Sequence, residues 1–217
     1  MSWFGGDKGY DRARLLADAR RAVKRGAHVK AIALYARVRE VEPENTDLLR
    51  RVAGLRVRAG QREEAWRDGC LAAEDLAKRG FVAEAIGLHR GYAARFPDNA
   101  AVWCALSDLE LERDRRPDAV SVLLEGSGHF RSRARREDAL ALLRRARRID
   151  PNHFEANFRL AGLMARSGAK QPARRILESL VPHAKTRRDR RRLRGRLFRL
   201  APSPAAAWRW LLAVFGG

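Results

Sequence analysis

The sequence predicts an all-α solenoid, and three observations lead to this fold class. Pro43, Pro97 and Pro151 are spaced by 54 residues and 54 again, and each opens a similar phrase. Apolar residues follow a helical period, whereas the runs of Val, Ile, Thr and Tyr that are typical of strands are hard to find. Aromatic residues make up only 7% of the 217 residues, which also argues against an all-β domain. A regular period favours a solenoid over a compact helical bundle, because each repeat packs mainly on its neighbours.

A finer period divides the 54-residue interval. A small residue recurs about five positions into a helix, in steps of 34, 20, 34, 20 and 34, at Ala31, Ala65, Ala85, Ala119, Ala139 and Ala173. Thirty-four residues fit two helices with their turns, and twenty fit one helix with its turn. We therefore expect a three-helix unit of 54 residues, used about three times after an opening helix pair.

The helices follow from the turn residues and from apolar stripes between them. A turn position lies five residues before each small residue, at Gly26, Gly60, Gly80, Asp114, Ala134 and Gly168. Each of the segments that begin with these prolines is interpreted as a turn that leads into the N-cap of a helix. In order, we expect helices over 10–25, 28–41, 45–59, 62–79, 82–95, 99–113, 117–132, 136–149, 153–167, 170–184 and 187–200. Within 117–132, the cluster Gly126-Ser127-Gly128 is interpreted as a soft spot inside a long helix.

Several of these positions resemble the tetratricopeptide repeat. The matching residues are Gly26, Ala31, Tyr35 and Pro43 in the first pair, Trp103, Leu106, Ala119 and Leu123 further on, and Leu160, Gly168, Ala173 and Leu177 near the end. The resemblance covers residues 12–184 and implies a right-handed α-solenoid of antiparallel helix pairs. The 20-residue steps depart from that family, so the helices at 62–79 and 117–132 are each expected to close one pair and open the next.

We expect three parts along the chain. Residues 1–9 form an N-terminal tail, residues 10–201 form the repeat domain, and residues 202–217 form a Pro-containing turn and an amphipathic helix. The start has no secretory signal pattern, and the longest apolar stretch, 205–215, is too short to cross a membrane. The expected location is cytoplasmic. The apolar tail residues Trp208, Trp210, Leu211, Leu212 and Phe215 either cap the last repeat or dock on a membrane or partner.

The sequence offers no catalytic, metal or cofactor site. None of the five His residues has a second ligand at helical spacing, so each is interpreted as a solvent-facing or helix-end His. Cys70 and Cys104 are interpreted as small buried packing residues. The acidic pairs lie among Arg residues, which favours a solvated salt-bridging face over acid catalysis. We therefore expect a protein that is not an enzyme and has no small-molecule substrate.

The resemblance implies a concave groove built from the first helix of each pair. The basic and aromatic residues at the matching positions are Arg20, Lys24, Arg50, Arg58, Phe158 and Arg166. Such a row suits an acidic protein partner, because guanidinium groups bind carboxylates in a bidentate manner. The alternative is that these Arg residues only solvate the outer faces of helices.

The positive charge is concentrated toward the C-terminus. Of the net charge of +20, +13 falls in residues 98–217. The basic patch comprises Arg144, Arg145, Arg187, Arg188, Arg190, Arg191, Arg192 and Arg194. An acidic partner, nucleic acid or an anionic membrane surface would each neutralise it. The leading hypothesis is a scaffold or adaptor for an acidic partner; the alternative is a peripheral membrane or nucleic-acid scaffold that uses helix 187–200 and the tail.

Overall fold

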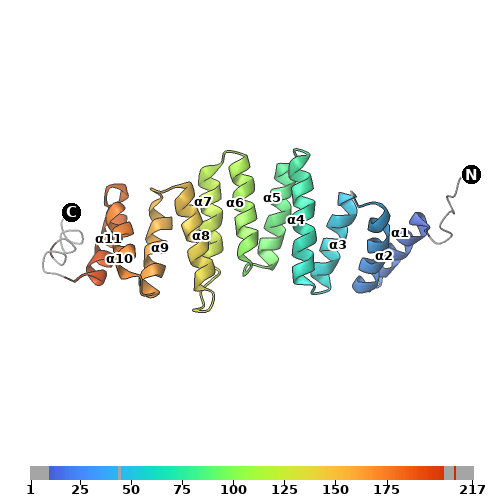
Figure 1. Ribbon diagram of the computed structural model, residues 1–217, viewed down its shortest axis with the longest axis horizontal. Helices are drawn as coiled ribbons and strands as arrows, with labels where there is room; N and C mark the ends of the chain where they lie inside the picture. Colours follow the sequence, from blue (N-terminus) through green and yellow to red (C-terminus); the bar gives the residue numbers. More distant parts are fainter. Residues whose placement is uncertain (1–9, 44, 203–207, 209–217) are drawn as a thin grey trace, which may run out of the picture. The chain divides into compact units, whose positions relative to one another are not determined.

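A computed structural model describes residues 10–43, 45–202 and 208, and the regular secondary structure of these residues is entirely helical (Figure 1). The helices are α1 (Arg12–Lys24), α2 (His28–Val41), α3 (Thr46–Arg58), α4 (Arg62–Lys78), α5 (Val82–Arg95), α6 (Ala100–Glu112), α7 (Arg116–Ser127), α8 (Arg136–Ile149), α9 (Phe154–Arg166), α10 (Lys170–Ser179) and α11 (Arg187–Leu200), with a 3-10 turn η1 (Val181–His183). The predicted all-α fold class is confirmed.

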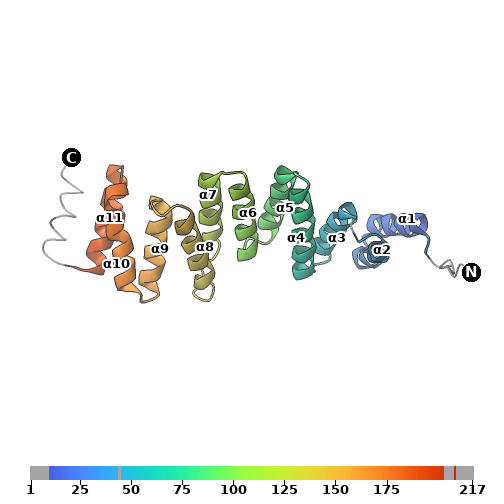
Figure 2. The same ribbon diagram turned by 45° about the horizontal axis from the view of Figure 1, so that its top comes forward.

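The chain divides into two compact units, residues 1–92 and 93–217, and the division falls within α5. In the first unit, α1 packs on α2, α2 on α3, and α3 on α4, which can be followed from blue to green in Figure 2. Gly26 lies between α1 and α2 and has a φ of +72°. This left-handed backbone conformation would be strained in a residue with a side chain. Ala19 and Ala31 are fully buried in the core between these helices, where the small side chain allows close packing.

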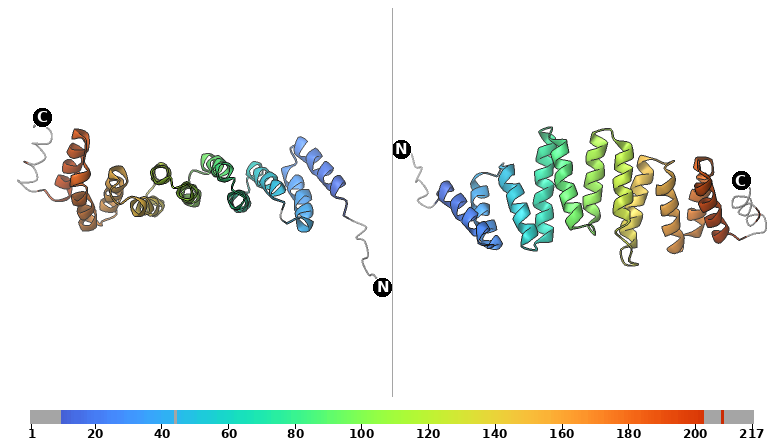
Figure 3. Two further views of the ribbon diagram at one scale, coloured as in Figure 1. Left: turned by 90° about the horizontal axis from the view of Figure 1, so that it is seen from above. Right: turned by 180° about the vertical axis from the view of Figure 1, so that it is seen from behind.

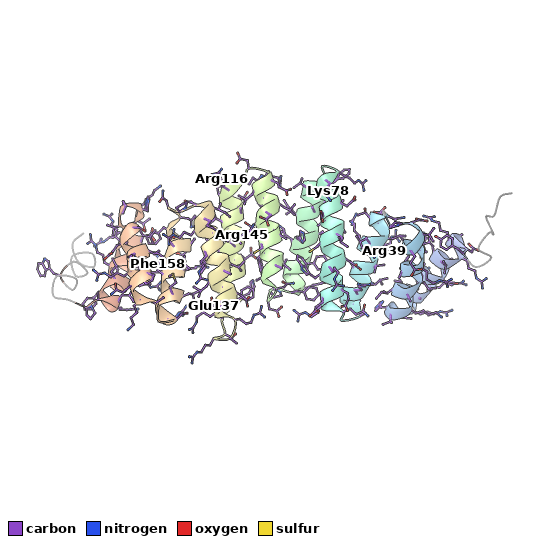
Figure 4. The ribbon with its side chains drawn as sticks, in the orientation of Figure 1. Arg39, Lys78, Arg116, Glu137, Arg145 and Phe158 are labelled. Carbon is purple, nitrogen blue, oxygen red and sulfur yellow. The ribbon has the colours of Figure 1, made fainter. Side chains whose placement is uncertain are left out.

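Helix α4 packs on two partners, as the 20-residue step predicts. It packs on α3, and it meets α5 through Trp66, whose ring lies 5.3 Å from that of His89 and 5.9 Å from that of Tyr92. A buried carboxylate also joins three helices: Asp68 of α4 lies 3.8 Å from Arg39 of α2 and 3.3 Å from Arg56 of α3. Burial raises the pKa of Asp68, and the two guanidinium groups oppose that rise. Arg39 is labelled in Figure 4.

In the second unit each helix from α6 to α11 packs on the next one, seen from yellow-green to red in Figure 3. Helix α7 packs on both α6 and α8, again as predicted. Gly126 of α7 allows α6 to approach closely, because a Cβ at this position would lie 2.4 Å from Cγ of the Trp103 ring of α6. Leu193 of α11 is buried in the same core as Ala173 and Leu177. Because Leu193 lies 54 residues after Ala139, α11 completes the third three-helix unit.

Two predicted helix ends are wrong. Helix α7 ends at Ser127 rather than at residue 132, so the glycine cluster terminates the helix instead of softening it. The Ser127 hydroxyl donates to the Leu124 carbonyl at 2.8 Å, which satisfies a carbonyl of the last turn. Helix α10 ends at Ser179, and Pro182, which has no N–H to donate, lies in the 3-10 turn that follows. The other predicted ends agree within two residues.

Part of the predicted tail lies outside the described residues. This holds for residues 1–9 and for Trp210, Leu211, Leu212 and Phe215, whereas Trp208 is described and is 64% exposed. Among the residues that are described, no helix combines the length and the apolar character that crossing a bilayer requires. The three predicted parts of the chain stay a prediction.

Candidate functional site: an arginine-lined pocket in the second unit

A pocket of about 730 Å³ lies in the second unit, between α9, α11 and the loop that follows α7. Among the described residues, seven arginines and no acidic residue line it. The arginines are Arg131, Arg136, Arg159, Arg166, Arg192, Arg196 and Arg199. We call this hollow the arginine pocket.

Helical spacing brings these side chains to one place. On α11, Arg192, Arg196 and Arg199 are four and three residues apart, so they share one helix face. On α9, Phe158 and Gly162 are one turn apart and lie beneath them. The adjoining face of α11 carries Leu193, which is buried in the core and fixes the rotation of the helix. The pocket wall is therefore set by the packing of the repeat.

The guanidinium of Arg196 is held in one position against α9. Its Nη1 donates to the backbone carbonyl of Phe158 at 2.8 Å, and its Cζ lies 3.9 Å from the centre of the Phe158 ring. A Cβ at Gly162 would lie 2.5 Å from this same Nη1, so the guanidinium occupies the space that a side chain would take. Arg192 also lies over the Phe158 ring, at 4.4 Å. Phe158, labelled in Figure 4, is only 5% exposed beneath the two guanidinium groups.

One carboxylate balances one end of the pocket. Glu155 accepts from Arg159 Nε at 2.7 Å and from Arg192 Nη1 at 2.9 Å. Burial alone would raise the pKa of Glu155, but the hydrogen bonds from Arg192 and Arg159 outweigh it and hold the pKa below its usual value. Glu155 thus neutralises part of the charge of two arginines.

The other five arginines of the pocket differ from Arg159 and Arg192 in this respect. Within residues 10–43, 45–202 and 208, no ion pair joins a carboxylate to any of Arg131, Arg136, Arg166, Arg196 and Arg199. Burial lowers the pKa of Arg196, and the charges of Arg192, Arg166 and Arg199 lower it further. The guanidinium still stays charged near neutral pH, because an arginine side chain ordinarily loses its proton only at a much higher pH. The cations therefore repel one another, and an anion would relieve that repulsion.

Backbone carbonyls orient several of these arginines. Arg136 Nη1 donates to the carbonyl of Arg166 at 3.2 Å, at the C-terminal end of α9, where the helix dipole favours a cation. Arg131 Nε donates to the carbonyl of Gly128 at 3.1 Å, and Arg159 Nη1 donates to that of Leu124 at 3.3 Å. A guanidinium has five N–H donors, so each keeps others for a ligand. The arrangement suits carboxylate or phosphate groups.

The structure brings some of the predicted site residues together. Phe158, Arg166 and Arg192 all line the arginine pocket. Arg20 and Lys24 of α1 and Arg50 and Arg58 of α3 belong to the first unit and are exposed. Their role as groove residues stays a prediction.

The predicted basic patch has several environments. Arg145 of α8, labelled in Figure 4, forms an ion pair with Asp108 of α6. Arg144 lies 3.6 Å from Glu137. Arg194 is half-buried on α11. The exposed members on α11 are Arg187, Arg188, Arg190 and Arg191.

Sequence reasoning missed most of the arginine pocket. Arg196, Arg199 and Arg136 were not among the predicted site residues. The usable signal is the spacing of Arg192, Arg196 and Arg199 on one face of a helix that continues the 54-residue period.

Other reactive groups have structural explanations. Among the described residues no group of three His, Cys, Asp or Glu side chains could hold a metal ion. Burial raises the pKa of the half-buried Cys70 thiol to about 11, which disfavours the reactive thiolate. The interpretation of His89 as solvent-facing is wrong, because it is 4% exposed against Trp66. His153 is a helix-end residue as predicted, since its Nδ1 caps α9.

The comparisons with known proteins agree with a helical repeat. The family model of the tetratricopeptide repeat matches residues 130–197, which include most of the arginine pocket. No curated protein matches the sequence. Similar solved structures include the C-terminal part of a TPR repeat-containing protein from Cytophaga hutchinsonii, with 13% identity, a TM-score of 0.34, and coverage of 93% of this chain and 95% of that one. Another is a thermophilic TPR protein of Thermus thermophilus, with 16% identity, a TM-score of 0.29, and coverage of 93% and 98%.

The antiparallel helix pairs, repeated with a fixed period, define an α-helical repeat protein of the solenoid class. The model of the tetratricopeptide repeat matches residues 130–197, and small buried residues recur with the same period earlier in the chain. Residues 130–197 of this chain are thus similar to the tetratricopeptide repeat. Proteins of this fold generally serve as protein-protein interaction scaffolds.

Proposed function

We propose that this protein is a non-enzymatic cytoplasmic scaffold that holds an acidic segment of a partner protein in the arginine pocket. The observation that carries the proposal is the charge of the pocket: seven arginines line it, and Glu155 pairs with only two of them. An acidic segment supplies the missing negative charge. The exposed residues Arg20, Lys24, Arg50 and Arg58 of the first unit are proposed to contact a separate segment of the partner, which the peptide probe below does not include.

The energetics favour a ligand that carries several charges. Hydrogen bonds to charged groups contribute about 1.5–3 kcal/mol each, and two guanidinium donors can share one carboxylate. Arg196 is already ordered by the Phe158 carbonyl, so less side-chain entropy is lost when it binds. Exposed charges are screened by salt, and the affinity should therefore fall as ionic strength rises.

Binding of a labelled peptide tests the proposal. Fluorescein-labelled hexaglutamate is titrated with the wild type and with the double variant Arg166→Gln, Arg199→Gln, by fluorescence anisotropy. The matched control is Arg50→Gln, Arg58→Gln, which removes the same net charge from the first unit; Arg58 lies 108 residues before Arg166, at the corresponding repeat position. We expect the pocket variant to weaken binding at least tenfold, from about 1.4 kcal/mol of lost interaction, and the control to change it less than threefold. Equal losses in the two variants would show that only net charge matters and would refute the pocket.

A second candidate function rests on the exposed face of α11. Arg187, Arg188, Arg190 and Arg191 are exposed, and no ion pair joins them to a carboxylate among the described residues. Such a cluster suits an anionic membrane surface or nucleic acid. Binding to phosphatidylserine vesicles or oligouridine that is lost when these four residues are changed to Gln, with hexaglutamate binding intact, would support this second function.

A further inference from the structure

A second hollow, of about 530 Å³, lies beside α9 and is bounded by α8 and α10. Its floor is apolar and consists of Pro151, Leu160, Met164 and Ile176. Its rim carries three arginines of α8: Arg144, Arg147 and Arg148. The volume falls in the range of ligand pockets. We call it the apolar pocket.

The apolar pocket and the arginine pocket use different faces of α9. Leu160 and Met164 face the apolar pocket, whereas Phe158 and Gly162 face the arginine pocket. Each pair is offset from the other by two residues, and two residues of α-helix turn through about 200°. The two sites are therefore on opposite sides of the helix, and they can be occupied at the same time.

The rim charges exceed what the neighbouring acids balance. Arg144 lies 3.6 Å from Glu137, but among the described residues no ion pair joins Arg147 or Arg148 to a carboxylate. Both residues lie in the last turn of α8, where the helix dipole accounts for cations. The helix dipole explains the two cations, but it does not explain why the apolar side chain of Met164 is partly exposed beside them. Met164 forms part of a pocket floor that has no charged side chain.

We propose that the apolar pocket binds one apolar side chain of a partner peptide that is flanked by acidic residues. The apolar side chain enters above Met164, and the flanking carboxylates pair with Arg147 and Arg148. Charge complementarity selects an acidic segment over a neutral or basic one. This site does not depend on the arginine pocket, and with both sites filled the second unit holds two acidic segments at once.

Met164 is a natural reporter of this pocket, because the sequence has only two methionines, Met1 and Met164. The full chain is labelled with ¹³C at the methionine methyl groups, and Met164→Leu identifies the Met164 signal. The probe is the acetylated, amidated peptide Glu-Glu-Leu-Glu-Glu. The controls are Glu-Glu-Ala-Glu-Glu, which lacks the apolar side chain, and Gln-Gln-Leu-Gln-Gln, which lacks the charge.

We expect the probe to shift the Met164 methyl signal in a saturable manner. Burial of Leu in place of Ala should strengthen binding roughly tenfold, and loss of the charges should weaken it to a similar degree. Arg147→Gln with Arg148→Gln should weaken binding at least fivefold, whereas Arg166→Gln with Arg199→Gln should leave the Met164 shift unchanged.

Three results would overturn the proposal. One is a Met164 signal that does not move at probe concentrations that saturate the protein by anisotropy. Another is an equal response to the Ala and Leu peptides. The last is a shift with decanoate but not with the Leu peptide, which would assign the pocket to a fatty acid. If hexaglutamate binds the wild type and the Arg166→Gln, Arg199→Gln variant equally well while the Leu peptide still shifts the Met164 signal, only the proposed function is refuted.

Discussion

Replacing Gly162 by Ala tests directly whether the Arg196 guanidinium lies against Gly162 and Phe158 of α9. The new Cβ would lie 2.5 Å from Arg196 Nη1, whereas carbon and nitrogen in ordinary contact are about 3.5 Å apart. The guanidinium must therefore withdraw by about 1 Å, which lengthens its 2.8 Å bond to the Phe158 carbonyl beyond hydrogen-bonding distance.

The free energy of this change has two opposing parts. Ala stabilises a helix relative to Gly by about 0.5–1 kcal/mol. The lost hydrogen bond from a charged donor costs about 1.5–3 kcal/mol, toward the lower end here because Arg196 is only half-buried. We expect Gly162→Ala to lower the free energy of unfolding by about 0.5–1 kcal/mol. Gly54→Ala is the matched control 108 residues earlier: nothing lies within 4 Å of its Cβ, so it should raise stability by about 0.5–1 kcal/mol.

Urea unfolding followed by far-UV circular dichroism measures both variants and completes a double-mutant cycle. In an Arg196→Gln background the clash and the bond are both gone, so Gly162→Ala should become stabilising. This reversal of sign is the expected result. If Gly162→Ala is as stabilising as Gly54→Ala in the wild type, the Arg196 guanidinium does not lie beside Gly162, and the proposed structure of this wall of the arginine pocket is wrong.

Three further predictions concern pH, packing and charge. Burial lowers the pKa of His89 to about 4, whereas in the unfolded chain it is near 6.5, so the unfolded state binds more protons than the folded state as pH falls. Between pH 7 and 5 the free energy of unfolding of the wild type should therefore fall by about 2 kcal/mol more than that of His89→Leu, measured by urea unfolding. Equal losses in the two proteins would contradict this. Gly126→Ala places a Cβ 2.4 Å from Cγ of the Trp103 ring, so it should lower stability by about 1–3 kcal/mol by urea unfolding; a gain like that of Gly54→Ala would be the contrary result. Glu155→Gln frees Arg159 and Arg192 from their internal carboxylate and should strengthen hexaglutamate binding about two- to fivefold by anisotropy, whereas weaker binding would show that Glu155 positions the arginines for the ligand.

The repeat and most helix bounds could be predicted because they depend on local spacing. Ala31, Ala65 and Ala119 each lie where two helices approach closely, and that requirement is visible as a period in the sequence. The end of α7 was not predictable in the same way. Gly126 is inside the helix because Trp103 needs the space, whereas Gly128, two residues later, caps its end. Only the tertiary contact separates the two roles.

The candidate site was predictable in part. The sequence shows that Arg192 and Arg196 share a face of α11, and it places Phe158 and Arg166 at groove positions of α9. It does not show that these two faces meet, because the meeting depends on how both helices pack on α10. Nor does it show that Phe158 is covered by guanidinium groups, since burial of an aromatic ring beneath charged side chains has no periodic signature.

The most direct test of the arginine pocket is to locate a bound acidic peptide. Hexaglutamate with a nitroxide at its N-terminus broadens the amide signals of nearby residues in an NMR spectrum of the ¹⁵N-labelled protein. We predict selective broadening around Gly162 and Arg166 of α9 and around Arg196 and Arg199 of α11, reversed by unlabelled peptide. Broadening confined to α3 or to the exposed start of α11 at Arg187 and Arg188 would contradict the assignment of the acidic partner to this pocket.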